Sequence, residues 1–371
     1  MQTSIQPGFQ GIGHATARGI ATGASRRGRL GRTLLVHGPR AADAGSFVED
    51  LLAMLLCADT DLDRRPCNAC RGCRDGRGRT HPDLVIGSPA LWRESKSGGE
   101  SIVAAARRWL MEASGAPIVA RQRVILIEGV DGANEQIQNA LLKALEEPNP
   151  RQLFVLTADE PGRVLPTIRS RSQSLRLGPV PRHELVAWLV DREHLTDDQA
   201  RAVARIADGM AGAALGFAHN PQQLEWRRRV QGQLLDLLHR GRADRIATAR
   251  DMVADAIRMV GEGGEPATTP DEDATGRAAP ATGQQRAGAL LVLDAWIALA
   301  RDLAMVAAGR GHLAPSVELV EGTEAAGTAI SAAEAARAVR ALERIRDGVA
   351  VNAAPRLAML VAMLAWPTVG R

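Results

Sequence analysis

All four cysteines of this 371-residue chain lie in one short stretch. They are Cys57, Cys67, Cys70 and Cys73, with the spacing C-x9-C-x2-C-x2-C. Two cysteines at C-x2-C spacing turn both sulfur atoms toward one point, and four thiolates are a common ligand set for a closed tetrahedral zinc site. The spacing therefore predicts a structural zinc module at residues 57–73, without an open coordination position for catalysis.

Two other uses of these cysteines compete with zinc. A C-x2-C pair also occurs in disulfide and redox sites, although a redox pair does not need two further cysteines beside it. His81 is an additional candidate ligand, because it follows the cluster closely in the chain. We expect a structural role for His81 and zinc binding by the four cysteines.

A second stretch stands where a phosphate-binding loop would be expected, directly after an apolar run. Such a loop has the form GxxxxGK[ST], in which backbone N–H groups and the lysine hold phosphates and the hydroxyl binds magnesium. Counting from Gly38, the positions of the second glycine, the lysine and the hydroxyl residue hold Asp43, Ala44 and Gly45. A carboxylate repels phosphate, and Arg40 stands at the wrong place to replace the lysine. We therefore expect no ATP on this chain.

The apolar pattern predicts the elements that position these residues. Five short segments are predicted as strands, and two of them, at residues 124–127 and 153–157, are unbroken apolar runs that are too short for helices and typical of buried strands. The five segments span residues 33–37, 83–86, 123–127, 153–157 and 174–177. Helical periodicity lies between them, as at residues 47–56 and 102–112, and between Asn134, a helix N-cap, and Pro148, a stop. This alternation predicts an α/β fold with a doubly wound parallel sheet.

Two segments of this region resemble a known family. Residues 139–148 read NALLKALEEP and residues 165–172 read LPTIRSRS, and both are similar to segments of clamp-loader AAA+ subunits. The cysteine spacing also resembles the zinc module that is inserted in those subunits. Within the family, the chain is most similar to the delta-prime subunits of bacterial DNA polymerase III, because these also depart from the ATPase pattern in their nucleotide site.

The resemblance also draws attention to the ends of the third and fourth predicted strands. Clamp-loader ATPases carry an Asp-Glu pair after the third strand, which holds magnesium and polarises the attacking water. This chain has Glu128-Gly129 there, so a glycine replaces the residue that orients water. Thr157 stands at the family's sensor position, where we expect its hydroxyl to act as a capping or backbone partner.

Arg171 is the catalytic residue that the resemblance implies. In the family, the arginine of an SRC triplet reaches into the ATP site of a neighbouring subunit and stabilises charge on the γ-phosphate. The triplet here is Ser170-Arg171-Ser172, which keeps the arginine in register. The alternative is that Arg171 or Arg169 forms a surface ion pair within its own chain.

The length of the chain indicates more than one domain. The resemblance divides it into an AAA+-like domain at residues 1–179, a helical lid at 180–220 and an all-α collar at 221–371. Residues 1–29 show little periodicity, and we expect a poorly ordered lead with a short helix near residues 14–20. Residues 261–288 are rich in Gly, Pro, Ala and Thr, which predicts a disordered insert within the collar.

The C-terminal half shows helical periodicity over most of its length. The predicted helices span residues 222–241, 243–260, 289–308, 325–349 and 355–366. Residues 352–358 read NAAPRLA, which resembles a signature of clamp-loader collar domains, with Ala354 in place of an asparagine. A helical bundle that exposes apolar faces usually packs against partners, which favours an oligomeric collar.

Composition narrows the remaining function classes. The formal net charge is only +4, because 46 basic residues are interspersed with 42 acidic ones. Although Lys96 and Lys143 are the only lysines, this balance does not by itself indicate a nucleic-acid partner. No run of 18 apolar residues and no signal-peptide pattern occur, so we expect a cytoplasmic protein without a membrane partner.

The resemblance implies a non-ATPase clamp-loader subunit, which in isolation is not an enzyme. It would belong to the DNA-directed DNA polymerase holoenzyme, a nucleotidyltransferase, and contact a gamma/tau ATPase subunit and the delta subunit. Through the complex it would help to load the sliding clamp onto primed DNA. Two alternatives are an ATP-hydrolysing subunit of the same machine and a zinc-containing DNA-binding protein. The latter has few platforms for base stacking, since the chain has no Tyr and only four Phe.

Overall fold

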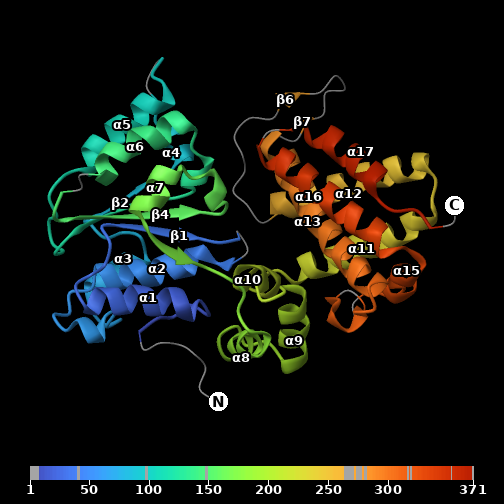
Figure 1. The fold of residues 1–371 in the computed structure, drawn as a ribbon, viewed down its shortest axis with the longest axis horizontal. Coiled ribbons are helices and arrows are strands. Elements are labelled where there is room, and N and C mark those ends of the chain that lie inside the picture. The colour runs from blue at the N-terminus through green and yellow to red at the C-terminus, as the bar shows by residue number, and fades with distance from the viewer. Residues whose placement is uncertain are drawn as a thin grey trace. The chain divides into compact units, whose positions relative to one another are not determined.

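The structure is a computed structural model of the chain. It describes residues 8–39, 42–96, 99–146, 149–262, 271–272, 278–279, 282–315, 317, 320–351 and 353–369. Two compact units are present, Met1–Ala218 and His219–Arg371 (Figure 1). Among the described residues, no helix combines the length and the apolar character needed to cross a membrane.

The N-terminal unit is built on a five-stranded parallel sheet. Its strands are β1 (Thr33–His37), β2 (Leu84–Gly87), β3 (Arg123–Ile127), β4 (Gln152–Ala158) and β5 (Gln173–Arg176). They are arranged in the order β2-β3-β4-β1-β5, and every neighbouring pair is parallel. Each strand lies within one residue of its predicted bounds, and the predicted α/β fold with a parallel sheet is confirmed.

Helices cover both faces of this sheet, which explains why its central strands are apolar at successive positions. Leu34 and Val155 pack on one face, whereas Leu35 and Phe154 pack on the other. Figure 1 shows α1 to α3 on one side of the sheet and α4 to α7 on the other. These helices are α1 (Ala15–Arg26), α2 (Ala44–Leu55), α3 (Arg71–Arg77), α4 (Pro89–Glu94), α5 (Ile102–Ala113), α6 (Glu135–Glu146) and α7 (Pro166–Arg171).

The prediction of a poorly ordered N-terminal lead is wrong from residue 8 onward; residues 1–7 lie outside the described residues. Phe9 and Ile12 are buried, and α1 is longer than the predicted short helix. The backbone N–H groups of Gln10 and Gly11 each donate to the Asp50 carboxylate at 2.9 Å. A buried carboxylate requires such donors, so the contact with Asp50 fixes the segment around Gln10 and Gly11. Because Asp50 lies far away in the sequence, the local apolar periodicity does not reveal this contact.

Three helices end the N-terminal unit beyond β5. They are α8 (Arg182–Arg192), α9 (Asp197–Ile206) and α10 (Ala211–His219). The start of α9 is a capping box, in which Thr196 and Gln199 bond reciprocally through side chain and backbone. The position of these helices in the chain is that of the predicted lid, and the division into lid and collar stays a prediction.

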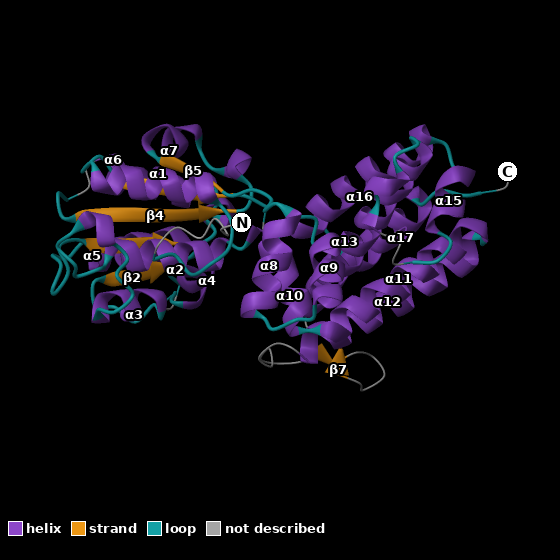
Figure 2. Ribbon diagram, turned by 90° about the horizontal axis from the view of Figure 1, so that it is seen from below, coloured by secondary structure: helices purple, strands orange, loops and turns teal. Residues whose placement is uncertain are grey.

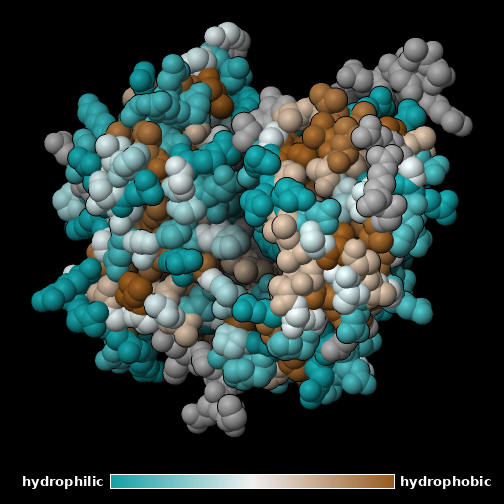
Figure 3. All heavy atoms as spheres, turned by 45° about the vertical axis from the view of Figure 1, so that its right-hand side comes forward, coloured by the Kyte–Doolittle hydropathy of each residue, from teal (hydrophilic) through white to brown (hydrophobic). Residues whose placement is uncertain are grey.

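The C-terminal unit is a helical bundle around a core that contains Trp226, Trp296 and Leu342. Its helices are α11 (Pro221–Asp236), α12 (Arg242–Glu262), α13 (Thr282–Ala307), α15 (Thr323–Ala329), α16 (Ala332–Val351) and α17 (Pro355–Ala365). Figure 2 shows these helices packed without a central sheet. The bundle exposes Leu357, Val361 and Leu364 along one face of α17. Apolar side chains also gather in patches on the surface of this unit (Figure 3).

The prediction of one continuous helix at residues 325–349 is wrong. The helix is interrupted between α15 and α16, where Ser331 and Glu334 form a reciprocal cap. The Glu334 N–H donates to Ser331 Oγ at 3.2 Å, and the Ser331 N–H donates to Glu334 Oε2 at 3.2 Å. This capping box stabilises a new helix start in the middle of an otherwise helical pattern.

The segment between the flanking helices is shorter than the insert predicted at residues 261–288. Helix α12 continues to Glu262, and α13 already begins at Thr282. Between them, the described residues form the short antiparallel pair β6 (Asp271–Glu272) and β7 (Ala278–Ala279). The prediction of disorder otherwise falls on residues outside the described part of the chain.

Candidate functional site

The four cysteines meet at one point between α2 and α3. Their Sγ atoms all lie within 4.8 Å of one another. The Cys67–Cys73 and Cys57–Cys70 sulfur pairs are each 3.9 Å apart. Four Zn–S bonds of about 2.3 Å in a tetrahedron place the sulfurs about 3.8 Å apart. The cluster therefore has the dimensions of a tetrahedral metal site, and none of the four cysteines forms a disulfide.

Close packing of two helices brings the cysteines together. Gly72 on α3 lies so near α2 that an added Cβ would stand 2.2 Å from the Leu56 carbonyl oxygen. Only a glycine permits this approach, which places Cys73 beside Cys57 at the end of α2. The glycine between two cysteines is a sequence signal for the module beyond the cysteine spacing itself.

The sulfurs differ in their electrostatic surroundings. Burial raises the pKa of Cys57 and of Cys73. Burial also raises the pKa of Cys70, but N–H donors from Ala58 and Cys73, together with bonds from other thiols, outweigh it and lower that pKa to about 6. A divalent cation would supply the charge that lets all four sulfurs deprotonate together.

His81 is not part of the cysteine cluster in the described part of the chain. It is buried, and the Asp83 backbone N–H donates to its Nδ1 at 3.0 Å. The structural role of His81 stays a prediction.

A buried carboxylate connects the cysteine module to the sheet domain. Asp50 on α2 is fully buried and forms ion pairs with Arg18 of α1 and Arg77 of α3. Arg77 also donates to Asn68 Oδ1 at 2.7 Å, within the cysteine loop. Sequence reasoning missed this network, and its only signal is an aspartate inside the apolar stretch FVEDLLAMLL.

The chain's own groups occupy the phosphate-loop position. Asp43 is the N-cap of α2, and its Oδ1 accepts the Ser46 N–H at 3.2 Å. His14 Nε2 lies 2.7 Å from the Ala42 carbonyl oxygen, and its ring packs edge-on against Phe47. A helix N-terminus attracts anions, and the Asp43 carboxylate already supplies one. Arg40, which was considered as a lysine substitute, lies outside the described residues.

The neighbouring strand ends are also satisfied internally. Glu128 follows β3 and pairs with Arg79 at 2.8 Å. The Gly129 N–H donates to Thr157 Oγ1 at 2.9 Å, so the expected backbone-partner role of Thr157 is confirmed. Glu128 and Thr157 stand at the C-terminal ends of β3 and β4, and Asp43 stands at the start of α2 in the segment that follows β1; each bonds to its own chain.

Arg171 lies at the other edge of the sheet, where α7 ends just before β5. Its side chain is 42% exposed and forms an ion pair of 3.0 Å with Glu146 Oε1, which is 46% exposed. It also donates to the Thr167 carbonyl oxygen at 3.2 Å. Arg171 therefore forms a surface ion pair within its own chain, which was the alternative to a role in a neighbouring subunit. An exposed pair of this kind contributes only about 0–1 kcal/mol, so it does not prevent the guanidinium from binding a stronger partner.

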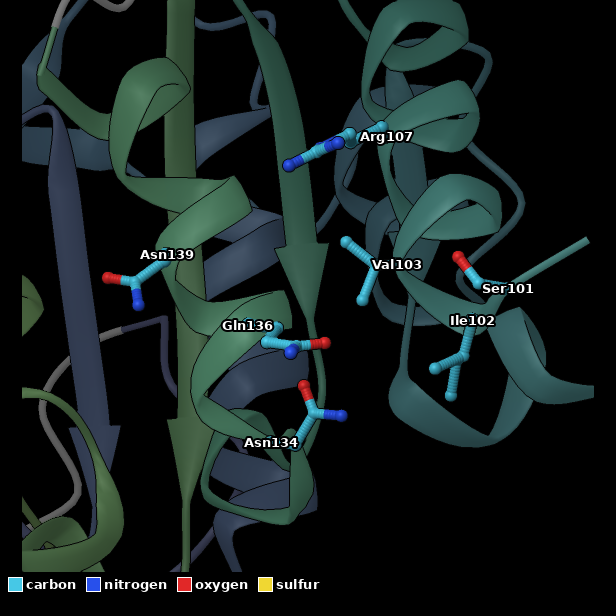
Figure 4. A pocket seen from close by; sticks show the side chains of 7 residues that line it. All are labelled: Ser101, Ile102, Val103, Arg107, Asn134, Gln136 and Asn139. Carbon is cyan, nitrogen blue, oxygen red and sulfur yellow. The ribbon is translucent and has the colours of Figure 1, made fainter.

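One hollow of about 500 Å³ lies between α5 and α6. Gln136 and Asn134 from the α6 side face Ile102 and Arg107 from the α5 side across it (Figure 4). None of the residues predicted as site residues lines this hollow.

Comparison with known proteins relates the N-terminal region to one family. Residues 17–181 match the family described as "DNA polymerase III, delta subunit". The chain is 29% identical over 190 residues to DNA polymerase III subunit delta' of Escherichia coli strain K12, covering 51% of this chain and 55% of that protein. It is 30% identical over 175 residues to the delta' subunit of Bacillus subtilis strain 168, covering 47% of this chain and 50% of that protein.

Related subunits of the same polymerase also match. The chain is 30% identical over 176 residues to DNA polymerase III subunit gamma/tau of Mycobacterium tuberculosis H37Rv, covering 47% of this chain and 29% of that protein. The chain thus spans about half the length of the delta' relatives named above. A DNA polymerase III gamma subunit-related structure from Thermotoga maritima aligns over 94% of this chain and 97% of its own, at 15% identity and a TM-score of 0.37. A likeness of that size adds nothing to the argument.

Proposed function

We propose that the chain is a clamp-loader subunit of the delta-prime type that does not hydrolyse ATP, because residues 17–181 match a DNA polymerase III subunit family and delta' subunits align with about half of the chain at 29–30% identity. The observation that carries this proposal is the Asp43 carboxylate at the start of α2. It occupies the helix N-terminus to which a nucleotide phosphate would bind, and it repels that phosphate. The missing lysine and the Glu128-Arg79 pair support the same conclusion.

Arg171 supplies the catalytic contribution in this proposal. It is exposed at the end of α7, and its ion pair with Glu146 is weak enough to be exchanged for a phosphate. An arginine fork that reaches the γ-phosphate in a neighbour's site neutralises charge that develops during phosphoryl transfer. The chain therefore acts as an arginine donor to an adjacent gamma/tau-type ATPase subunit.

The cysteine cluster holds a structural zinc ion in this proposal. Cys57, Cys67, Cys70 and Cys73 are its ligands, and their sulfur separations support a tetrahedral ion. With four protein ligands the ion has no open position, so its contribution is to fold the module rather than to catalyse a reaction. Asp50 and Arg77 then transmit the order of the module to α2 and α1.

The remaining partners follow from the family assignment alone. The chain contacts the delta subunit on its other side, and the helical C-terminal unit forms part of an oligomeric collar. The exposed apolar face of α17 supports such packing. The assembled complex loads the sliding clamp onto primed DNA in the cytoplasm, as part of the DNA polymerase III holoenzyme.

Reconstitution of the clamp loader with Arg171→Ala tests the proposal. The complex should assemble normally, and its clamp- and DNA-stimulated ATPase rate should fall, because one ATP site loses its arginine. Arg169→Ala is the matched control, since Arg169 is an exposed arginine on the same helix and should leave the rate unchanged. Equal ATPase rates for the Arg171→Ala complex and the wild type would contradict the role of Arg171.

A further inference from the structure

The loop between α5 and β3 exposes two large aliphatic side chains. Ile118 and Val119 are each 73% exposed, although both are among the residue types most often buried. They are adjacent in sequence and stand just before β3, at the edge of the sheet where the strands begin. These N-terminal strand ends lie at the tail of the β4 arrow in Figure 2.

A buried carboxylate holds this loop in one conformation. Asp83 is fully buried, and its two oxygens accept three consecutive backbone N–H groups. The donors are Ile118 at 2.5 Å, Val119 at 2.7 Å and Ala120 at 2.6 Å. Charge-assisted bonds are the stronger class of hydrogen bond, so the two aliphatic side chains project from a fixed backbone. A preorganised apolar group loses little conformational entropy on binding, which is a property of interface anchors.

Four arginines stand along the same edge, at or just before the starts of strands. Arg121 precedes β3 and Arg123 is its first residue; the Arg123 backbone N–H donates to the carbonyl oxygen of Arg151, which directly precedes β4, at 2.8 Å. Arg32 leads into β1 and donates to the Pro150 carbonyl oxygen. Within the described ranges, none of these four arginines forms an ion pair with a carboxylate. The edge therefore combines positive charge with an exposed aliphatic pair.

This combination fits a protein surface with an apolar depression bordered by carboxylates. Duplex DNA would use the arginines but not two aliphatic side chains, and single strands favour aromatic stacking. A membrane surface would require a larger apolar area than two residues provide. Complementary charge suppresses wrong partners and speeds association, while the aliphatic pair supplies contact energy.

The same edge carries Arg171. Two strands lie between β3 and β5, and at about 4.8 Å per strand the separation across the edge is about 14 Å. A standard protein interface buries about 800 Å² on each partner, which is wide enough to include both positions. We infer that Ile118 and Val119 are a second anchor for the subunit that receives Arg171, docking in an apolar, acid-rimmed pocket on that subunit. This inference rests on the proposed function, since it assigns the same partner.

The test measures binding of the full-length chain to the purified gamma/tau-type ATPase subunit by surface plasmon resonance. Ile118→Ala/Val119→Ala should weaken affinity roughly tenfold, mainly through faster dissociation. Arg121→Glu should slow association and make it less sensitive to salt, because it removes favourable steering. Val190→Ala is the matched control, an exposed valine on α8, and should leave affinity unchanged. Unaltered melting temperatures should accompany all three variants, because the changed side chains are exposed.

Unchanged affinity of the double-alanine variant would overturn the anchor. The anchor would also be wrong if the double-alanine variant bound a DNA duplex or anionic phospholipid vesicles more weakly than the wild type but bound the ATPase subunit equally well. The ATPase rate of the Arg171→Ala complex distinguishes failure of the Ile118/Val119 anchor from failure of the proposed function. If that complex loses ATPase activity while the double-alanine variant binds normally, the arginine role stands and the anchor is wrong. If the wild-type chain does not bind the ATPase subunit at all, the proposed function fails and the anchor fails with it.

Discussion

In the sheet of the N-terminal unit, the edge at which the parallel strands end and the edge at which they begin differ in how their polar and charged groups are satisfied. At the C-terminal edge, the Asp43 carboxylate caps α2, Glu128 pairs with Arg79, and Thr157 accepts a backbone N–H. At the N-terminal edge, Arg171 is exposed beside its partner Glu146. One edge is thus closed by contacts within the chain, and the other presents groups that a partner can bind.

The difference has a simple physical origin. A helix N-terminus leaves backbone N–H groups unpaired, and any acceptor that the chain supplies there competes with an incoming phosphate. Asp43 is such an acceptor and is permanently attached. Arg171 on the other edge is exposed and has only a weak local partner, so little free energy is lost when that ion pair opens.

The cysteine module contributes to the closed edge, and its loss should have the largest effect. Arg79 and Arg77, which pair with Glu128 and Asp50, lie at or just beyond the end of α3. We expect Cys73→Ser to abolish stoichiometric zinc and to lower the free energy of unfolding by at least about 3 kcal/mol. Elemental analysis and urea unfolding measure both quantities.

The control for this prediction is Asp75→Ala, which changes a non-ligand on the same helix. Asp75 forms an exposed ion pair with Arg71, so its removal should leave zinc content and stability nearly unchanged. A Cys73→Ser protein that retains one zinc and wild-type stability would show that the cluster does not hold the ion.

The next largest effect concerns the carboxylate that shapes the open edge. Burial raises the pKa of Asp83, but three N–H donors lower it by more, so the net pKa lies below its usual value. Asp83→Asn should lower the free energy of unfolding by about 2–3 kcal/mol at pH 7 and should increase hydrogen exchange at Ile118 and Val119.

The pH dependence of this effect has a defined sign. Because the folded-state pKa of Asp83 is depressed, its stabilisation is complete above the unfolded pKa of about 3.9 and is lost as pH falls through the folded pKa. The difference in unfolding free energy between wild type and Asp83→Asn should be constant from about pH 5 to 7 and shrink at lower pH. A difference that grows on acidification would contradict this assignment.

A third change should reopen the closed edge. The triple variant Asp43→Gly/Ala44→Lys/Gly45→Thr restores the glycine, lysine and hydroxyl of a phosphate-binding loop. We expect at least about tenfold tighter binding of an ATP analogue than in the wild type, without hydrolysis, because Gly129 cannot orient water. Asp43→Asn alone, which removes the charge but supplies no lysine, is the comparison. If the triple variant binds no better than the wild type, Asp43 and the missing lysine are not what closes this edge.

The smallest effect is expected at the Arg171 ion pair. Glu146→Ala should change the free energy of unfolding by no more than about 0.5 kcal/mol, because the pair lies at the surface and both side chains are more than two-fifths exposed. The ATPase rate of the reconstituted complex should be unchanged, since the pair is broken when Arg171 binds a phosphate. A rate that falls as far as in Arg171→Ala would indicate that Glu146 positions the arginine.

The parts of this fold that were predictable from sequence depend on local pattern. Unbroken apolar runs located β3 and β4, short segments between helical patterns located the other three strands, and the cysteine spacing located a cluster whose sulfurs do meet. The short helices α3, α4 and α7 escaped prediction, because six or seven residues are too few to show periodicity. The break before α16 was missed although Ser331 and Glu334 have capping-box spacing, because the helical pattern on either side continues across it.

The residues that sequence reasoning missed act over long distances in the chain. Asp50 binds backbone about 40 residues away, and Asp83 binds a loop about 35 residues away. Their neighbours in sequence give no indication of these partners, because tertiary folding alone brings them together. The same reason explains why the N-terminal segment was predicted to be poorly ordered.

We propose that the chain's own nucleotide position is closed to ATP. Titration of the isolated chain with a fluorescent ATP analogue and magnesium tests it most directly. We expect no saturable binding up to about 1 mM, because Asp43 repels phosphate and no lysine attracts it. Saturable, magnesium-dependent binding with a dissociation constant in the micromolar range would contradict it.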